Sequence, residues 1–245
     1  MCSPFVQRAP RAVLLVTLLS AALAAASCRS MLAPKYEYDE DVQLALDGSA
    51  IVSVNASVAA LVALRGASLD PNPRARLDTG AVRGFYQSPV ADVTSITTSR
   101  RDNRRFVHVK LDVPDIRRLN EAPALSWSQY ALTRNDKLTV FTQQVGAAVG
   151  KSVDGGWTGG ELVAFRLHLP SRVTYHNSPT REVERGNIIR WEQPLSDRLK
   201  GQPVAIEVQM ESESILFQTL TLFGITVVLA VLTMLLGVWW VRTRN

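Results

Sequence analysis

The chain has 245 residues, of which 47% are hydrophobic, and a formal net charge of +5. This length is enough for one folded domain, or two small ones, between terminal segments. Four of the five excess positive charges lie in the end segments, at Arg8, Arg11, Arg242 and Arg244, which leaves +1 for the part between them. A nearly neutral middle part argues against nucleic-acid binding, so we expect no nucleic acid among the partners.

Residues 1–27 have the organisation of a secretory signal peptide. Two arginines supply a positive start, residues 12–26 form an apolar stretch that is short for a membrane span, and small residues precede Cys28. The sequence Ala25-Ala26-Ser27-Cys28 resembles a bacterial lipobox, although it has alanine at the position where leucine is commonest. The resemblance implies that Cys28 becomes the lipidated first residue of the mature protein. Ordinary cleavage and an uncleaved signal anchor are the alternatives.

The two cysteines of the chain are Cys2 and Cys28. Cys2 would be removed with the signal peptide, so the mature chain would keep one cysteine and form no intramolecular disulfide. A lipid attached to Cys28 would anchor the protein, but more weakly than a transmembrane helix does.

The first folded elements are expected in residues 36–65. Apolar alternation on both sides of Asp47-Gly48 predicts a β-hairpin over 36–58. Ser57 is then expected to cap a short helix that ends before Gly66. A second helix is predicted over 74–83, where apolar residues recur on one side.

Two further hairpins are predicted in the following part of the chain. Strands at 90–98 and 105–113 flank a polar turn, and the second of them has the clearest alternation in the sequence. A short helix is expected over 115–121. Strands at 125–132 and 138–144 then flank another polar turn.

Residues 146–160 contain six glycines and are interpreted as a flexible connection. The remaining strands are predicted at 161–169, 172–175, 187–192 and 204–210. The predicted fold class is α+β, mostly antiparallel, with a few short helices. We expect two lobes, an α+β lobe over 28–145 and a β-rich lobe over 161–213.

Residues 215–241 are predicted to form a transmembrane helix. The uncharged, proline-free run Leu220–Val241 would make a helix about 33 Å long, which matches a bilayer core of about 30 Å. The residues expected at the membrane interface are Trp239, Trp240, Arg242 and Arg244. The positive-inside rule makes 242–245 a cytoplasmic tail. The expected location is therefore the bacterial cytoplasmic membrane, as a single-pass protein whose main domain is periplasmic.

The densest local charge lies in the turn between the strands at 90–98 and 105–113. It consists of four arginines, Arg100, Arg101, Arg104 and Arg105. These side chains are candidates for contact with anionic lipid headgroups, an acidic polymer or a partner protein. The alternative is a turn whose charges are simply solvated.

The sequence contains no catalytic or metal-binding motif. His168 and His176 are eight residues apart, and no cysteine or acid pair completes a ligand set. The glycine-rich segment around Trp157 does not lie between a strand and a helix, as a phosphate-binding loop would. Trp157 is either an exposed aromatic for binding or the anchor of its loop. The acidic run at 37–41 lacks a metal-ligand pattern, and we expect no metal, no cofactor and no enzymatic activity.

Several of these features together resemble the LppM-like domain family of bacterial envelope proteins. They are the exported leader with its cysteine, the pattern Tyr-x-Tyr-x-x-x-x-x-Leu-x-Leu-Asp-Gly-Ser at Tyr36–Ser49, the block Phe165–Pro170 with Asn177 and Asn187–Trp191, and the membrane helix with a basic end. The resemblance implies a β-rich domain outside the cytoplasmic membrane. It implies no catalytic residue.

The expected function is that of a membrane-anchored, non-enzymatic envelope protein with a binding or scaffolding role. Its partners would be membrane lipids and an envelope protein or glycolipid. One alternative is a lipid- or glycolipid-binding module with a pocket between the lobes and the arginine turn at its rim. Another is an envelope enzyme, which a cleft holding two carboxylates with shifted pKa values would favour.

Overall fold

The computed structural model describes residues 34–213 and 215–244. The predicted signal peptide and the predicted lipidation site Cys28 lie outside the described residues. The helices and strands are β1 (Lys35–Leu44), β2 (Ala50–Ser57), α2 (Val58–Arg65), α3 (Thr79–Tyr86), β3 (Asp92–Arg101), β4 (Arg104–Val113), η1 (Ile116–Glu121), η2 (Pro123–Leu125), β5 (Ser128–Arg134), β6 (Leu138–Val145), β7 (Glu161–His168), β8 (Val173–His176), β9 (Ile188–Pro194), α4 (Leu195–Leu199), β10 (Val204–Glu211) and α5 (Ile215–Arg244).

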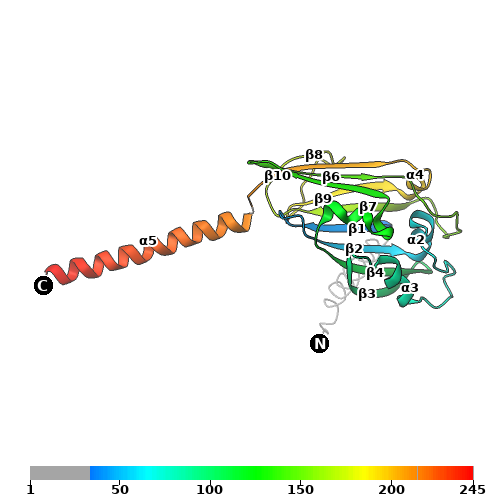
Figure 1. Ribbon diagram of the computed structural model, residues 1–245, viewed down its shortest axis with the longest axis horizontal. Coiled ribbons are helices and arrows are strands. Elements are labelled where there is room, and N and C mark those ends of the chain that lie inside the picture. Colours follow the sequence, from blue (N-terminus) through cyan, green and yellow to red (C-terminus); the bar gives the residue numbers. More distant parts are fainter. Residues whose placement is uncertain (1–33, 214, 245) are drawn as a thin grey trace, which may run out of the picture. The chain divides into compact units, whose positions relative to one another are not determined.

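The strands form two sheets (Figure 1). One has six strands in the order β3-β4-β2-β1-β7-β9, and the other has four in the order β5-β6-β10-β8. Asp39 contacts Arg166 and Asp41 contacts His168 with the same separation of 127 residues, so β1 and β7 run parallel. The other paired strands are antiparallel. The predicted fold class is confirmed.

The division into two lobes is wrong. Strands β7 and β9 from the predicted second lobe extend the sheet of β1 to β4, and β10 and β8 extend the sheet of β5 and β6. Each sheet therefore contains strands from both sides of the glycine-rich segment. β7 pairs with the edge of β1, and β10 pairs with the edge of β6. Two separate lobes would leave both edges without a partner strand.

The first hairpin and its following helix confirm the local predictions. β1 and β2 pair in register from Tyr38↔Ala56 to Leu44↔Ala50, and Gly48 in the turn has a φ of 96°. The Ser57 side chain accepts a hydrogen bond from the backbone N–H of Ala60, which caps α2. Gly66 ends the helix in the left-handed region.

Some predicted boundaries differ from the structure for local reasons. Helix α3 begins at Thr79 instead of residue 74, because the Asp78 side chain caps it by accepting from Gly80 and Ala81. The predicted helix at 115–121 is the 3₁₀ helix η1. The strand predicted from residue 125 begins at Ser128, after the short turn η2, and α4 was not predicted.

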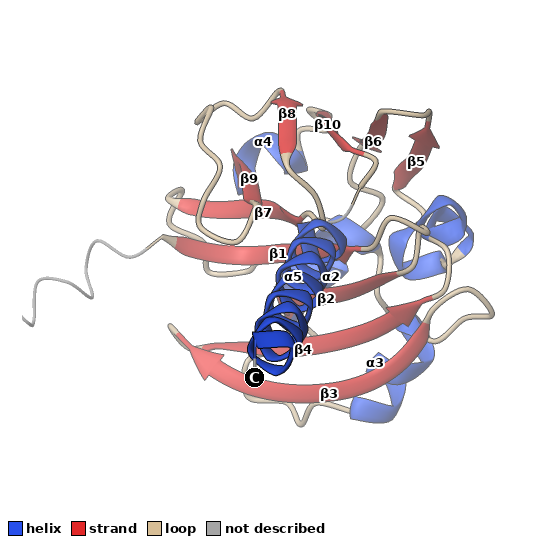
Figure 2. Ribbon diagram, turned by 90° about the vertical axis from the view of Figure 1, so that its left-hand side faces the viewer, coloured by secondary structure: helices blue, strands red, loops and turns tan. Residues whose placement is uncertain are grey.

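The hydrophobic core lies on one face of the six-stranded sheet. Alternate side chains of β2 and β4, such as Val54 and Leu111, are fully buried there with Leu61 and Leu64 of α2. Helices α2 and α3 lie on this same side of the sheet (Figure 2). The four-stranded sheet also meets this face, through Phe141 and other buried residues. The opposite face of the six-stranded sheet carries mainly polar side chains, and it contains the site described next.

Candidate functional site

Helix α5 is the part of the structure best suited to a membrane. Its segment Thr219–Arg244 has 26 residues, its most apolar 18-residue stretch has a mean hydropathy of 2.4, and none of that stretch is buried inside the protein. Large apolar side chains such as Phe223, Leu236 and Trp239 are exposed. The Thr226 and Thr233 hydroxyls donate to carbonyls of their own helix, which satisfies them without water. The Arg244 guanidinium lies 3.9 Å from the centre of the Trp240 ring.

A network of polar side chains covers the open face of the six-stranded sheet. We call it the polar face, and it consists of Tyr36, Asp39, Asp41, Asn55, Ser99, His108, Arg166, His168, Arg190 and Glu192. These residues come from all six strands. Residues two apart on one strand, such as Asp39 and Asp41, share this face because side chains alternate along a strand. Tyr36, near the start of β1, joins the face through its hydroxyl contacts with β9. The polar face therefore brings together three parts of the sequence. They are the acidic run at 37–41, through Asp39 and Asp41, the strand end beside the arginine turn, through Ser99, and His168.

A line of hydrogen bonds crosses four of the strands. Ser99 Oγ lies 2.8 Å from His108 Nε2, and His108 Nδ1 lies 2.9 Å from Asn55 Oδ1. Asn55 donates from Nδ2 to Asp39 Oδ2 over 3.4 Å. An ionised Asp39 can only accept, so Asn55 presents its oxygen to His108 Nδ1–H, and His108 Nε2 is left to accept the Ser99 proton.

One ion pair and one further hydrogen bond join β1 to β7 beside this line. Arg166 Nη1 donates to Asp39 Oδ2 at 3.0 Å, and His168 Nε2 lies 2.9 Å from Asp41 Oδ2. Burial raises the pKa of Asp39, and the nearby Arg166 guanidinium opposes that change without cancelling it. His168, for which the sequence offered no metal-ligand set, is thus held by a carboxylate.

Tyr36 links β1 to the edge strand β9. Its hydroxyl donates to Glu192 and accepts from Arg190 Nη1 at 3.1 Å. Burial and the bond to Glu192 raise the pKa of the Tyr36 hydroxyl. Arg190 also pairs with Glu184, so Arg190 and Glu192 are largely committed to contacts within the protein.

The structure separates the four arginines of the predicted contact site into two kinds. Arg104 is mostly buried, pairs with Glu37 at 3.2 Å and Glu161 at 3.5 Å, and donates to the carbonyls of residues 155 and 156. Arg105 is buried and donates to the carbonyls of Asp70 and Ala75. Both side chains therefore hold loops in place.

Arg100 and Arg101 are the exposed members of the turn. Arg101 donates to the Tyr36 carbonyl at 2.6 Å, and its guanidinium lies 4.5 Å from the Phe106 ring centre. Contact of these two side chains with an anionic surface stays a prediction.

The glycine-rich segment is held in place by specific bonds. Trp157 Nε1 donates to Glu37 Oε2 at 3.1 Å, so Trp157 anchors its loop. The backbone N–H groups of Thr158 and Gly159 donate to the Glu161 carboxylate. Burial alone would raise the pKa of Glu161, but these backbone bonds outweigh burial and lower it. His176, on β8, lies on the other sheet from His168.

A pocket of about 370 Å³ lies beside the arginine turn. It is lined by Val58, Ala59, Pro71, Pro73, Asp102, Asn103, Arg104, Arg105, Asp154, Gly155 and Gly156. Two acids and two arginines balance its formal charge. The pocket lies within one domain and not between two lobes, and its mixed lining differs from the mainly apolar pocket that a lipid chain needs.

A second polar cluster was missed by sequence reasoning. The fully buried Glu40 accepts hydrogen bonds from Tyr38, Tyr130 and Gln143 at 2.8 to 3.0 Å, where the two sheets meet. Burial, followed by the Glu40 carboxylate, raises the pKa of Tyr38 and Tyr130. One signal pointed to it: Glu40 stands at an inward position of β1, between Tyr38 and Val42.

The Arg65 and Arg198 guanidinium groups lie over the Trp127 ring, with their Cζ atoms 4.0 and 4.9 Å from its centre. Both arginines are buried and donate to backbone carbonyls. Cation–π contacts of this kind stabilise a desolvated guanidinium. This cluster, like Glu40, is closed to solvent and has a structural role.

No cofactor or metal site is assembled from the described residues. Within 34–213 and 215–244, no three His, Cys, Asp or Glu side chains come close enough to hold a metal ion. The polar face offers hydrogen-bond donors and acceptors and an ion pair between Asp39 and Arg166.

Comparison with known proteins gives one structural similarity. No protein-family model matches the chain, and no curated protein matches it. The structure is similar to the NMR structure of the folded domain of the Mycobacterium tuberculosis LppM protein, with a TM-score of 0.40 and 10% sequence identity, over 73% of this chain and 92% of that one. A similarity at this level does not assign a family, so membership of the LppM-like family stays a prediction.

Proposed function

We propose that the protein is a single-pass, membrane-anchored envelope protein whose folded domain has a non-enzymatic binding or scaffolding role. Helix α5 carries this proposal, because its most apolar 18-residue stretch has a mean hydropathy of 2.4 and none of it is buried inside the described protein. Exposing so much apolar surface to water is unfavourable, and a bilayer removes it. The proposed partners are membrane lipids and a second envelope component.

Membrane anchoring is tested by extraction of four forms of the protein. They are the full chain, the chain ended after Glu213, and each of these with Cys28→Ala. The full chain with Cys28→Ala should stay in the membrane after alkaline carbonate and leave only with detergent. Its release by carbonate would overturn anchoring by α5. Intact mass then shows whether Cys28 carries acyl chains.

The proposed orientation places residues 34–213 outside the cytoplasm. The observation behind it is the pair Arg242 and Arg244 at the end of α5. A protease added to spheroplasts should degrade the domain, whereas inverted vesicles should protect it. The opposite pattern would contradict the orientation while leaving the anchor intact.

A second candidate function, acyl transfer or ester hydrolysis, is favoured by one observation. Ser99, His108 and Asn55 are arranged as a nucleophile, a base and a group that orients the base. We rank it second because Ser99 is exposed on an edge strand, and the groove that it helps to line is open to solvent. A fluorophosphonate probe should label wild-type protein but not Ser99→Ala if this function holds. Ser95→Ala, on the same face of β3, is the matched control, and an unlabelled wild type excludes the candidate.

A further inference from the structure

The outer edge of β3 carries backbone groups that are free to bind another strand. β3 is the terminal strand of its sheet, and Asp102 and Asn103, with φ of 50° and 55°, form the two-residue turn to β4. In a hairpin of this kind the residues beside the turn bond to each other, and every second residue then turns its N–H and C=O outward. By this alternation, Ile96, Thr98 and Arg100 point their backbone groups away from β4.

Val93, at the other end of the edge, confirms the alternation. The backbone N–H and C=O of Val93 also point outward, and side chains beside β3 form hydrogen bonds with both groups. Its N–H donates to Gln87 Oε1 at 3.0 Å, and its carbonyl accepts from Arg83 Nη1 at 2.7 Å. A bulge between Val93 and Ser95 follows. Among the described residues, no hydrogen bond is found to the outward backbone groups of the edge from Ile96 to Arg100.

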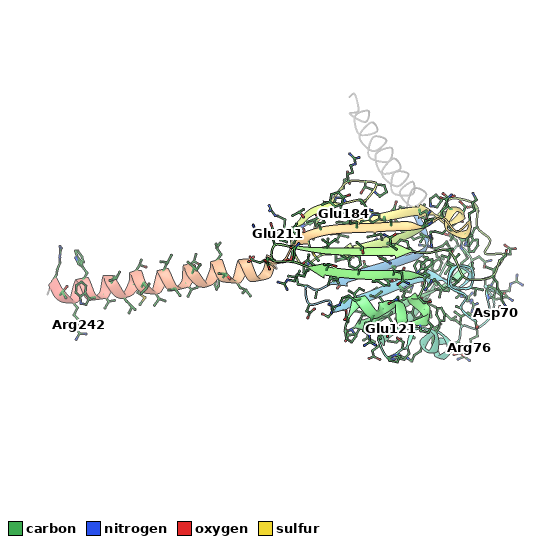
Figure 3. All side chains as sticks on the ribbon, turned by 45° about the horizontal axis from the view of Figure 1, so that its top comes forward. Asp70, Arg76, Glu121, Glu184, Glu211 and Arg242 are labelled. Atoms are coloured by element: carbon green, nitrogen blue, oxygen red, sulfur yellow. The ribbon has the colours of Figure 1, made fainter. Side chains whose placement is uncertain are left out.

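A basic groove of about 320 Å³ runs beside this open edge. It is lined by Ala75, Arg76, Leu77, Thr79, Thr98, Ser99, Arg100 and Arg105. Its charged residues are all arginines, and Arg76 and Arg100 are exposed. Arg105 holds the groove wall by donating to the carbonyls of Asp70 and Ala75. Asp70 and Arg76 lie at the same end of the domain (Figure 3).

We propose that the edge of β3 from Ile96 to Arg100 binds an extended acidic segment of a partner polypeptide as an added strand. Main-chain bonds to the outward groups would supply affinity, and alternate side chains would enter the groove or face its arginines. The open stretch carries Arg100 and no acid, so its charge favours an acidic partner over a second copy of this chain. The inference rests on the binding role proposed above and names its partner.

The test uses the full chain in detergent micelles and a short fluorescent peptide in which glutamate and valine alternate. Fluorescence anisotropy should report saturable binding. The same peptide with its alternate backbone nitrogens methylated should bind at least about tenfold more weakly, because it loses the donors that pair with β3. A peptide with lysine in place of glutamate should not bind.

Three variants locate the binding. Thr98→Pro removes only an outward N–H, which edge strands tolerate, and should weaken binding about tenfold or more. Thr98→Val keeps that N–H and should bind like wild type. Arg100→Glu should weaken binding and its salt dependence. Circular dichroism confirms that each variant is folded.

Two outcomes would overturn the proposal. One is that the methylated peptide binds as tightly as the unmethylated one, or that Thr98→Pro binds the peptide as tightly as wild type does. Either result would show that charge attraction alone causes the binding. The other is the absence of peptide binding together with binding of anionic lipid vesicles that Arg100→Glu abolishes, which would assign the edge to headgroups. Neither outcome affects membrane anchoring, which the extraction experiment decides separately.

Discussion

Glu40 and Asp39 are neighbours on β1 and point to opposite faces of the same sheet. Glu40 is fully buried between the sheets and accepts from three neutral donors. Asp39 lies on the polar face, where it contacts Arg166 and Asn55. The difference teaches that the two buried carboxyls are held in different ways. Glu40 has a full set of neutral donors, whereas Asp39 has one guanidinium and one amide on Oδ2 and no hydrogen-bond partner on its buried Oδ1.

The largest effect is expected from Glu40→Leu. The change leaves Tyr38, Tyr130 and Gln143 without their shared acceptor inside the core, so unfolding free energy should fall by about 3–5 kcal/mol. Chemical denaturation of the detergent-solubilised chain measures this change in unfolding free energy. Glu40→Gln, which keeps one acceptor oxygen, should lose less. A loss below about 1 kcal/mol for Glu40→Leu would break the contrast with Asp39.

A slightly smaller loss is expected from Arg104→Met. The substitution leaves the buried carboxylates of Glu37 and Glu161 without their ion pairs, at a cost of about 2–4 kcal/mol. Arg100→Met is the matched control in the same turn, and it should change stability by less than about 0.5 kcal/mol because Arg100 is exposed. Equal effects in the two variants would contradict the division of the arginine turn into buried and exposed members.

A pH-dependent effect of about 1–2 kcal/mol is expected from Glu161→Gln. Because the folded-state pKa of Glu161 is lowered, its stabilisation is present above its unfolded value, near 4.5, and is lost as pH falls through the folded-state pKa. The variant should therefore melt below wild type at neutral pH and approach it in acid. Thermal unfolding from pH 7 down to about pH 3 measures this. A difference that does not change with pH would exclude the carboxylate as the cause.

The smallest effect is expected from Asp39→Asn, within about 0.5 kcal/mol at neutral pH. The loss of the Arg166 pair is offset because burial disfavours the ionised carboxyl. Since the folded-state pKa of Asp39 is raised above 3.8, its share of stability is present below that value and is lost as pH rises through the folded-state pKa. Wild type should thus decline relative to the variant over that interval. A large loss at neutral pH would show that Asp39 behaves like Glu40.

Much of the local structure could be predicted because its causes lie within a few residues. Ser57 and Gly66 bound α2 through backbone geometry that needs no distant partner. The apolar helix α5 could be predicted for the same reason, because its hydrophobicity is a property of its own residues. In contrast, nothing near Arg104 in the chain shows that Glu37 and Glu161 will surround it, so the arginine turn could be found but its buried half could not be recognised.

The sequence by itself determined the α+β class, the hairpins, the capped helix and an apolar C-terminal helix long enough to span a membrane, because period, turn chemistry and hydrophobicity act locally. The tertiary structure alone decided that strands on both sides of the glycine-rich segment share two sheets. It also decided which donors meet Glu40, that the polar face assembles from six strands, and that the edge of β3 stays open. Those outcomes depend on which surfaces meet after long-range pairing, and no local pattern encodes them.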